Sequence, residues 1–109
     1  MRDKIIAIFK NYIPVSSSEY EDKKNFLTWR LTDEEYENLL AAEVMDKLEE
    51  ACEIEIERFN DVEFTGQNLE KGFTLVESIC LQNKTIELEK LKKIFKDGLQ
   101  RKTGVRFSF

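Results

Sequence analysis

The segment from Asp33 to Phe59 constrains the fold most, because a row of apolar residues runs through it at helical spacing. Six apolar residues, each four positions after the last, form the row: Tyr36, Leu40, Val44, Leu48, Cys52 and Ile56. On a helix of 3.6 residues per turn, such a row drifts by about 40° per step, so it cannot face one straight neighbour throughout. We therefore predict a helix over Asp33–Phe59 that either crosses several neighbours or breaks.

The start of this helix is marked by a capping box, with Thr32 as the N-cap and Glu35 three residues later. Its end fits two patterns, because residues 52–58 also alternate like a strand. The helical spacing that continues from Met45 to Phe59 favours helix there, and strand is the alternative.

Two further segments precede this helix. The apolar spacing over Asp3–Ile13 predicts a helix that Pro14 ends, with a buried strand over Lys4–Phe9 as the alternative. Residues 16–21 hold two capping-box spacings, which indicate a short helix start.

The C-terminal half shows two more amphipathic helices. We predict one over Gln67–Leu81, where Gly72 allows close contact with another helix. Thr85 is the expected N-cap of the second, which runs to about Lys102, with Gly104 as the residue that ends it. Cysteines 52 and 80 fall on apolar rows, so we expect reduced core residues, with an inter-helix disulfide as the alternative.

These elements predict a single mainly α domain over residues 1–109. Its length of 109 residues, hydrophobic fraction of 41% and single proline suit a compact bundle of about four helices. Residues 25–31, 61–65 and 105–109 have strand-like patterns, and we expect them to form a small β-ribbon, with 105–109 as an edge strand. A mixed α+β fold is the alternative.

The residues available exclude most catalytic and ligand chemistries. The chain has no histidine, which removes the commonest general base and metal ligand. It also has no phosphate-binding glycine loop and no calcium loop. We expect no enzyme activity, no metal and no cofactor. The N-terminal apolar run is too short for a signal peptide or a membrane span, so we expect a cytoplasmic protein that does not bind membranes.

Negative charge is concentrated in the predicted acidic helix. Asp33–Phe59 contains 11 of the 22 carboxylates, with Lys47 and Arg58 as its cations, whereas the rest of the chain sums to +4 (−5 + 9). Five of these carboxylates are spaced 3, 4, 3 and 4 residues apart, within about 80° of arc on a helix. They are Glu43, Asp46, Glu50, Glu53 and Glu57.

Three interpretations of this acidic row are open. It could be a solvated face, it could pair internally with Lys90, Lys93 or Lys96, or it could bind a basic partner. Direct nucleic-acid binding is not expected, because phosphates would be repelled by the acidic helix.

A small, acidic domain without histidine or motifs is similar in general type to the immunity proteins that neutralise bacterial toxins, many of which are basic nucleases. The likeness is one of composition and charge, so no site residue is taken from it. We expect a non-catalytic immunity or inhibitor protein that uses the acidic row. The alternatives are a phage-type inhibitor that mimics nucleic acid and a self-associating helical adaptor.

Overall fold

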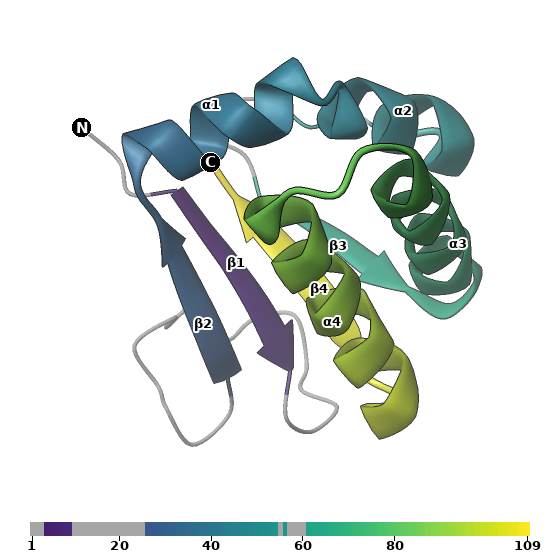
Figure 1. The fold of residues 1–109 in the computed structure, drawn as a ribbon. Helices are drawn as coiled ribbons and strands as arrows, with labels where there is room; N and C mark the ends of the chain where they lie inside the picture. The colour runs from purple at the N-terminus through teal and green to yellow at the C-terminus, as the bar shows by residue number, and fades with distance from the viewer. Residues whose placement is uncertain (1–3, 10–25, 55, 57–60) are drawn as a thin grey trace.

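The chain forms a mixed α+β fold, with helices packed on one face of an antiparallel sheet (Figure 1). The computed structural model describes residues 4–9, 26–54, 56 and 61–109. The described elements, in chain order, are β1 (Lys4–Phe9), β2 (Phe26–Leu31), α1 (Asp33–Ala41), α2 (Val44–Cys52), β3 (Asp61–Thr65), α3 (Gly66–Gln82), α4 (Ile86–Arg101) and β4 (Gly104–Ser108). The prediction of a mainly α bundle is therefore wrong, and the α+β alternative is correct.

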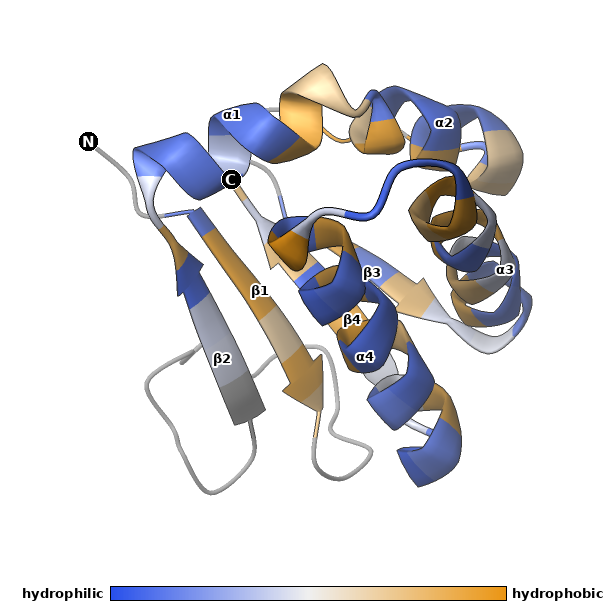
Figure 2. Cartoon of the chain, in the orientation of Figure 1, coloured by the Kyte–Doolittle hydropathy of each residue, from blue (hydrophilic) through white to orange (hydrophobic). Residues whose placement is uncertain are grey.

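The sheet has the strand order β2-β1-β4-β3, and every neighbouring pair is antiparallel. Its register brings apolar side chains into rows on the helix-covered face. In one row Ile6 of β1 lies opposite Trp29 of β2 and Phe107 of β4. Such cross-strand pairs stabilise a sheet, because same-face side chains of neighbouring strands touch. Figure 2 shows the resulting hydrophobic band along β1 and β4.

The N-terminal segment differs from its prediction. Lys4–Phe9 is a strand, not part of a helix over Asp3–Ile13. Five consecutive residues of β1 are buried, so both of its faces are covered, and a run of apolar residues suits such a strand as well as it suits a helix. Pro14 and the capping-box spacings of residues 16–21 lie outside the described residues.

The C-terminal strand is also placed differently from its prediction. β4 lies inside the sheet rather than at its edge, and all five of its residues are buried. Lys102, with φ of 57°, ends α4 in the left-handed conformation that we expected of Gly104. Gly104 is needed for space instead: a Cβ there would lie 2.8 Å from Thr65 Cγ2 and 3.0 Å from the Phe64 carbonyl oxygen.

The predicted acidic helix is broken into α1 and α2 at Ala42–Glu43, and α2 ends at Cys52 instead of continuing to Phe59. The break is one of the two outcomes that the drifting apolar row allowed. It buries Leu39 completely, whereas Leu40, a member of the predicted row, is 44% exposed. The change of direction lets α2 present Val44, Leu48 and its other apolar residues to α3.

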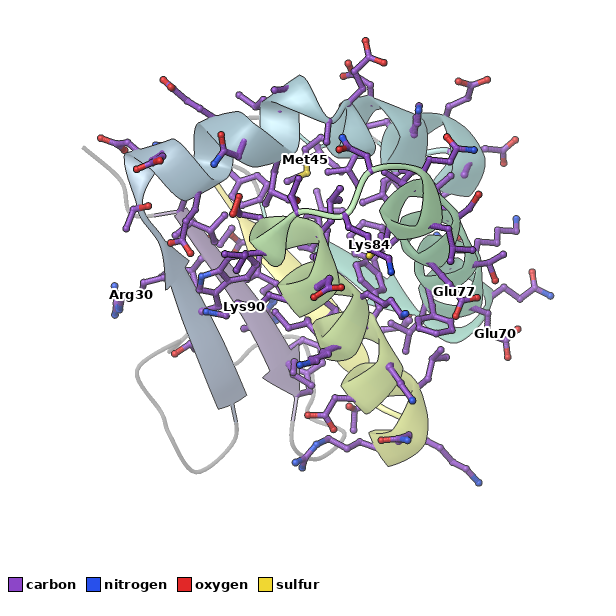
Figure 3. The ribbon with its side chains drawn as sticks, in the orientation of Figure 1. Arg30, Met45, Glu70, Glu77, Lys84 and Lys90 are labelled. Carbon is purple, nitrogen blue, oxygen red and sulfur yellow. The ribbon has the colours of Figure 1, made fainter. Side chains whose placement is uncertain are left out.

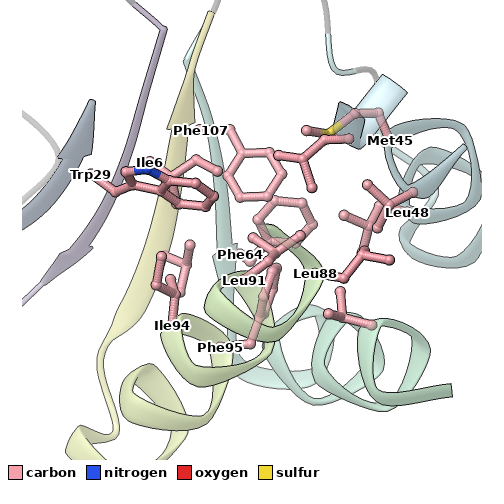
Figure 4. Close-up of a cluster of buried hydrophobic side chains, with 14 of the residues drawn as sticks. Ile6, Trp29, Met45, Leu48, Phe64, Leu88, Leu91, Ile94, Phe95 and Phe107 are labelled. Carbon is pink, nitrogen blue, oxygen red and sulfur yellow. The ribbon is translucent and has the colours of Figure 1, made fainter. Parts of the chain in front are cut away.

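The core lies between the helices and the sheet and is rich in phenylalanine (Figure 4). Phe64, Phe95 and Phe107 come from β3, α4 and β4, and their ring centroids lie 4.8 to 6.0 Å apart. Tilted and edge-on ring pairs at this distance are favourable beyond the area they bury.

The sheet face opposite this core carries a polar cluster. Arg106 of β4 is only 3% exposed, and its guanidinium pairs with the Glu63 carboxylate of β3 and lies over the Phe9 ring. On the same face Ser108 donates a hydrogen bond of 2.6 Å to the Asp61 carboxylate. A buried arginine is tolerable here because its charge is compensated.

Candidate partner-binding surface

Negative charge gathers on α1, α2 and the residues that flank them. From Asp33 to Glu53 the chain has nine carboxylates and one lysine, Lys47, a sum of −8. By contrast, α4 has five cations and three carboxylates, a sum of +2. Figure 1 shows α1 and α2 following one another along the same end of the molecule, so the folded protein keeps the charge segregation of the sequence.

The first turn of α1 uses its acidic residues within the fold. The Thr32 hydroxyl accepts a hydrogen bond of 3.1 Å from the Glu35 N–H, and the Glu35 carboxylate accepts one of 2.9 Å from the Thr32 N–H. This confirms the predicted capping box. Asp33 forms an ion pair of 3.8 Å with Lys4 of β1. These side chains therefore stabilise the start of α1.

The Glu35 carboxylate lies in surroundings that favour its charged form. The Thr32 N–H is the main cause of its lowered pKa, with smaller contributions from the Thr32 hydroxyl, the Trp29 indole and Lys90. The Trp29 N–H is buried near this carboxylate, but it reaches no acceptor at hydrogen-bond distance among the described residues. The Lys90 ammonium lies 4.4 Å from the centre of the Trp29 ring, and Figure 3 shows this lysine reaching from α4 toward β2.

The acidic residues around α2 are placed differently, because they are exposed. Asp46 and Glu50, one helical turn apart, lie on α2, whereas Glu43 and Glu53 flank its two ends. Among the described residues, no hydrogen bond or ion pair joins any of these four carboxylates to another side chain. We call Glu43, Asp46, Glu50 and Glu53 the acidic surface.

The observed acidic surface differs from the predicted acidic row in one respect. A continuous helix would align all five predicted carboxylates, but α2 covers only Val44–Cys52. Glu57 lies outside the described residues. The structure therefore brings four of the predicted site residues to the two ends and the outer side of one short helix.

Glu43 and Glu53 adopt the left-handed conformation, with φ of 60° and 55°. This conformation costs a residue with a Cβ about 1–2 kcal/mol, and glycine or asparagine would be favoured there. Neither glutamate makes a cap hydrogen bond through its side chain that would offset the cost. The fold therefore carries two glutamates at positions where their backbone conformation is unfavourable.

The lysines of α4 do not neutralise the acidic surface. α2 packs against α1 and α3, whereas α4 packs against α3, α1, β1 and β4. Lys90 is directed to Trp29, and Lys93 and Lys96 are exposed on α4. The internal pairing that the sequence left open is thus absent among the described residues.

The structure also contains a groove that the sequence did not reveal. It has a volume of about 710 Å³ and lies along α3 beside Ala51 of α2. A second cavity, of about 380 Å³, lies between the start of α3 and the end of α4, near Leu69 and Leu99. Most of the residues that line the first groove lie on α3, but Ala51 comes from α2, so spacing within one helix gives no sign of the groove.

Cys52 and Cys80 are both buried and neither forms a disulfide, which agrees with their prediction as core residues with free thiols. The Cys52 thiol donates to the Asn68 carbonyl oxygen at 3.6 Å, and burial raises the pKa of this thiol. The contact holds the end of α2 beside the start of α3. Within the described part of the chain, no three acidic or cysteine side chains are grouped to hold a metal ion.

Comparisons with protein-family models, with curated proteins and with solved structures found no match to this chain. None of the helices in the described ranges is both long and apolar enough to cross a membrane.

Proposed function

We propose that the protein is a non-catalytic inhibitor or immunity protein that binds a basic protein partner through the acidic surface. The observation that carries this proposal is that Glu43, Asp46, Glu50 and Glu53 are exposed and unpaired with any described residue. A bacterial nuclease toxin is the kind of partner we favour, because nucleases that bind a phosphate backbone present clusters of Lys and Arg.

Electrostatic attraction gives such a surface a definite role in binding. A concentration of like charge on one side of a protein accelerates encounter with an oppositely charged partner and disfavours partners of the same charge. The inhibitor would then occupy the cationic surface that its target uses for a polyanionic substrate. The carboxylates need no catalytic group and no metal to act in this way.

The conformations of Glu43 and Glu53 are consistent with a binding role. Residues held in unfavourable backbone conformations cluster at functional sites, where their position matters more than the stability it costs. Replacing either glutamate by glycine would relieve the backbone and remove a carboxylate from the acidic surface.

The proposal is tested with a charge-reversal variant, Glu50→Lys with Glu53→Lys. The wild-type chain is immobilised to capture proteins from its native cell, and each captured protein is identified, purified and titrated. We expect at least one basic partner whose affinity falls by about 100-fold in the variant, since loss of one member of a charge pair that is buried on binding costs about 2–5 kcal/mol. The wild-type chain should also inhibit the partner's activity.

A matched control is Glu37→Lys with Glu89→Lys, which changes the net charge equally at exposed positions of α1 and α4. This control should reduce the association rate slightly and leave the dissociation rate unchanged. A partner that binds the reversal variant as tightly as the wild type would show that the acidic surface is not the site.

A further inference from the structure

The groove along α3 adjoins the acidic surface. It is open to solvent, and most of its surface belongs to carbon atoms, although only Ala51 and Leu75 among its lining residues are apolar. The other lining residues are Gln67, Glu70, Lys71, Thr74 and Ser78. Ala51 lies between Glu50 and Glu53 on the last turn of α2, and the Cys52–Asn68 contact holds this turn against α3. A molecule seated in the groove would therefore lie beside two of the four carboxylates.

The groove has the dimensions of a short helical segment. Its lining runs from Gln67 to Ser78, which is about 16 Å along α3 at 1.5 Å per residue. That length matches about three turns of a helix lying along α3. Because the groove is open rather than enclosed, it suits an extended occupant better than a compact small molecule.

The charge around the groove selects the kind of helix. Glu50 and Glu53 stand close to Ala51 in the chain, and the lining itself carries Glu70 and Lys71, so the groove and these neighbours together sum to −2. Figure 3 shows Glu70 and Glu77 on the side of α3 that faces away from the sheet. An acidic occupant would be repelled by these walls, whereas a cationic one would be attracted to their rims.

We infer that this groove receives the apolar face of a basic amphipathic helix of the protein partner. The inference rests on the proposed function and extends it, because it names the element of the partner that makes the contact. Apolar residues of the docked helix at positions i, i+3, i+4 and i+7 would contact Ala51 and Leu75. Its Lys and Arg residues would face Glu50, Glu53 and Glu70.

Three synthetic 14-residue peptides labelled with fluorescein provide the probes. The first alternates Leu and Lys at helical spacing so that one face is apolar, the second replaces each Leu by Ser, and the third replaces each Lys by Glu. Binding to the full chain is measured by fluorescence anisotropy. We expect the Leu/Lys peptide to bind at least about tenfold more tightly than the Ser/Lys peptide, because only the former buries apolar area. The Leu/Glu peptide should not bind.

A variant that fills the groove separates the inference from the proposed function. Thr74 and Ser78 are exposed on α3, so Thr74→Arg with Ser78→Arg should leave the fold intact, which circular dichroism and thermal melting verify. The matched control, Gln82→Arg with Gln100→Arg, adds the same charge at exposed positions outside the groove. We expect the groove variant to abolish the advantage of the Leu/Lys peptide and the control to retain it.

Lys71→Gln tests the sign of the charge, because it removes the cation from the groove lining. It should tighten binding of the Leu/Lys peptide about two- to threefold.

Equal affinity for the Leu/Lys and Ser/Lys peptides, or equal behaviour of groove variant and control, would overturn the helix-in-groove inference alone. Binding of both cationic peptides that is insensitive to Glu50→Lys with Glu53→Lys would instead overturn the proposed function. If the chain dimerises and the groove variant dissociates the dimer, the occupant is a second copy and the inference is wrong.

Discussion

The side chain of Glu35 links three elements at the start of α1. Its carboxylate caps the Thr32 N–H, and Trp29 of β2 and Lys90 of α4 lie close enough to help lower its pKa. Thr32 and Glu35 are recognisable in the sequence because the capping box is a local motif of two residues. The contributions of Trp29 and Lys90 are not recognisable, since they depend on how β2 and α4 pack against α1.

The capping box gives a pH-dependent contribution to stability. Because the pKa of Glu35 is lower in the folded protein than its ordinary value of 4.5, the contribution is present above pH 4.5 and is lost as the pH falls below it. We expect Glu35→Gln to keep the hydrogen bond but lose this dependence, so its stability should approach that of the wild type between pH 7 and pH 3. Urea denaturation at both pH values measures the difference.

Substitution of the hydroxyl partner provides the comparison. Thr32→Ala should cost about 1 kcal/mol of unfolding free energy at neutral pH. Thr85, whose hydroxyl accepts a hydrogen bond of 3.1 Å from the Leu88 N–H, caps α4 without an acidic partner. Thr85→Ala should therefore cost a similar amount at both pH values. If Glu35→Gln lowers the unfolding free energy by the same amount at pH 7 and at pH 3, the pH dependence does not come from Glu35.

The packing of α3 against α4 depends on a glycine. A Cβ at position 72 would lie 2.6 Å from Cε1 of Phe95, so the two helices approach as closely as they do because this side chain is absent. The sequence predicted that Gly72 permits a close helix contact, and the structure confirms it. The identity of the partner was not predictable, because Phe95 is one of several apolar residues on α4.

We expect Gly72→Ala to destabilise the protein by about 1–3 kcal/mol through this clash, although alanine is the better helix former. Phe95→Leu in the same chain should recover part of the loss, since it removes the atom that is hit. Thermal or urea unfolding of the two single variants and the double variant gives the coupling energy. Ser78→Ala, at an exposed position of the same helix, is the control and should change stability by less than about 0.5 kcal/mol. Additive effects of Gly72→Ala and Phe95→Leu would show that the clash is not the cause.

Three of the four strands and the two C-terminal helices lie within two residues of their predicted bounds, whereas the N-terminal helix prediction was wrong and the predicted acidic helix is broken. Residues 67–81 and 85–102 show helical periodicity, the second with Thr85 as its cap, and α3 and α4 appear within one or two residues of those bounds. Lys4–Phe9 is apolar on both faces, so its period does not distinguish a buried strand from a helix. Glycine and proline are the usual sequence signs of a helix break, and neither occurs near Glu43. Only the drift of the apolar row indicated that a break could occur.

Charge is divided between two sides of the folded protein. α1, α2 and the residues that flank them carry nine of the described carboxylates, and α4, separated from α2 by α3, carries four of the nine described lysines. The sequence showed that the acidic residues were concentrated, because charges can be counted. It could not show whether lysines of α4 would reach them, since that depends on which helices become neighbours. The groove beside Ala51 was not predicted either, because it too depends on which helices become neighbours.

The pairing of β1 with β4 determines the order in which the protein can fold. Ile6 and Phe107 are direct partners although 101 positions separate them (107 − 6), so joining the two central strands requires closing a loop that contains nearly every other element. The contact between α3 and α4 closes only a short turn, and local contacts form faster than distant ones. In pulsed hydrogen exchange during refolding, we expect amides of α3 and α4 to become protected before those of β1 and β4. Simultaneous protection of all four elements would contradict this order.

The strand that joins β1 to β3 is β4, and it follows every other described element in the chain. A ribosome therefore releases β1 and β3 before β4. Until β4 is made, the edges of β1 and β3 that it will cover are exposed and must be shielded from aggregation.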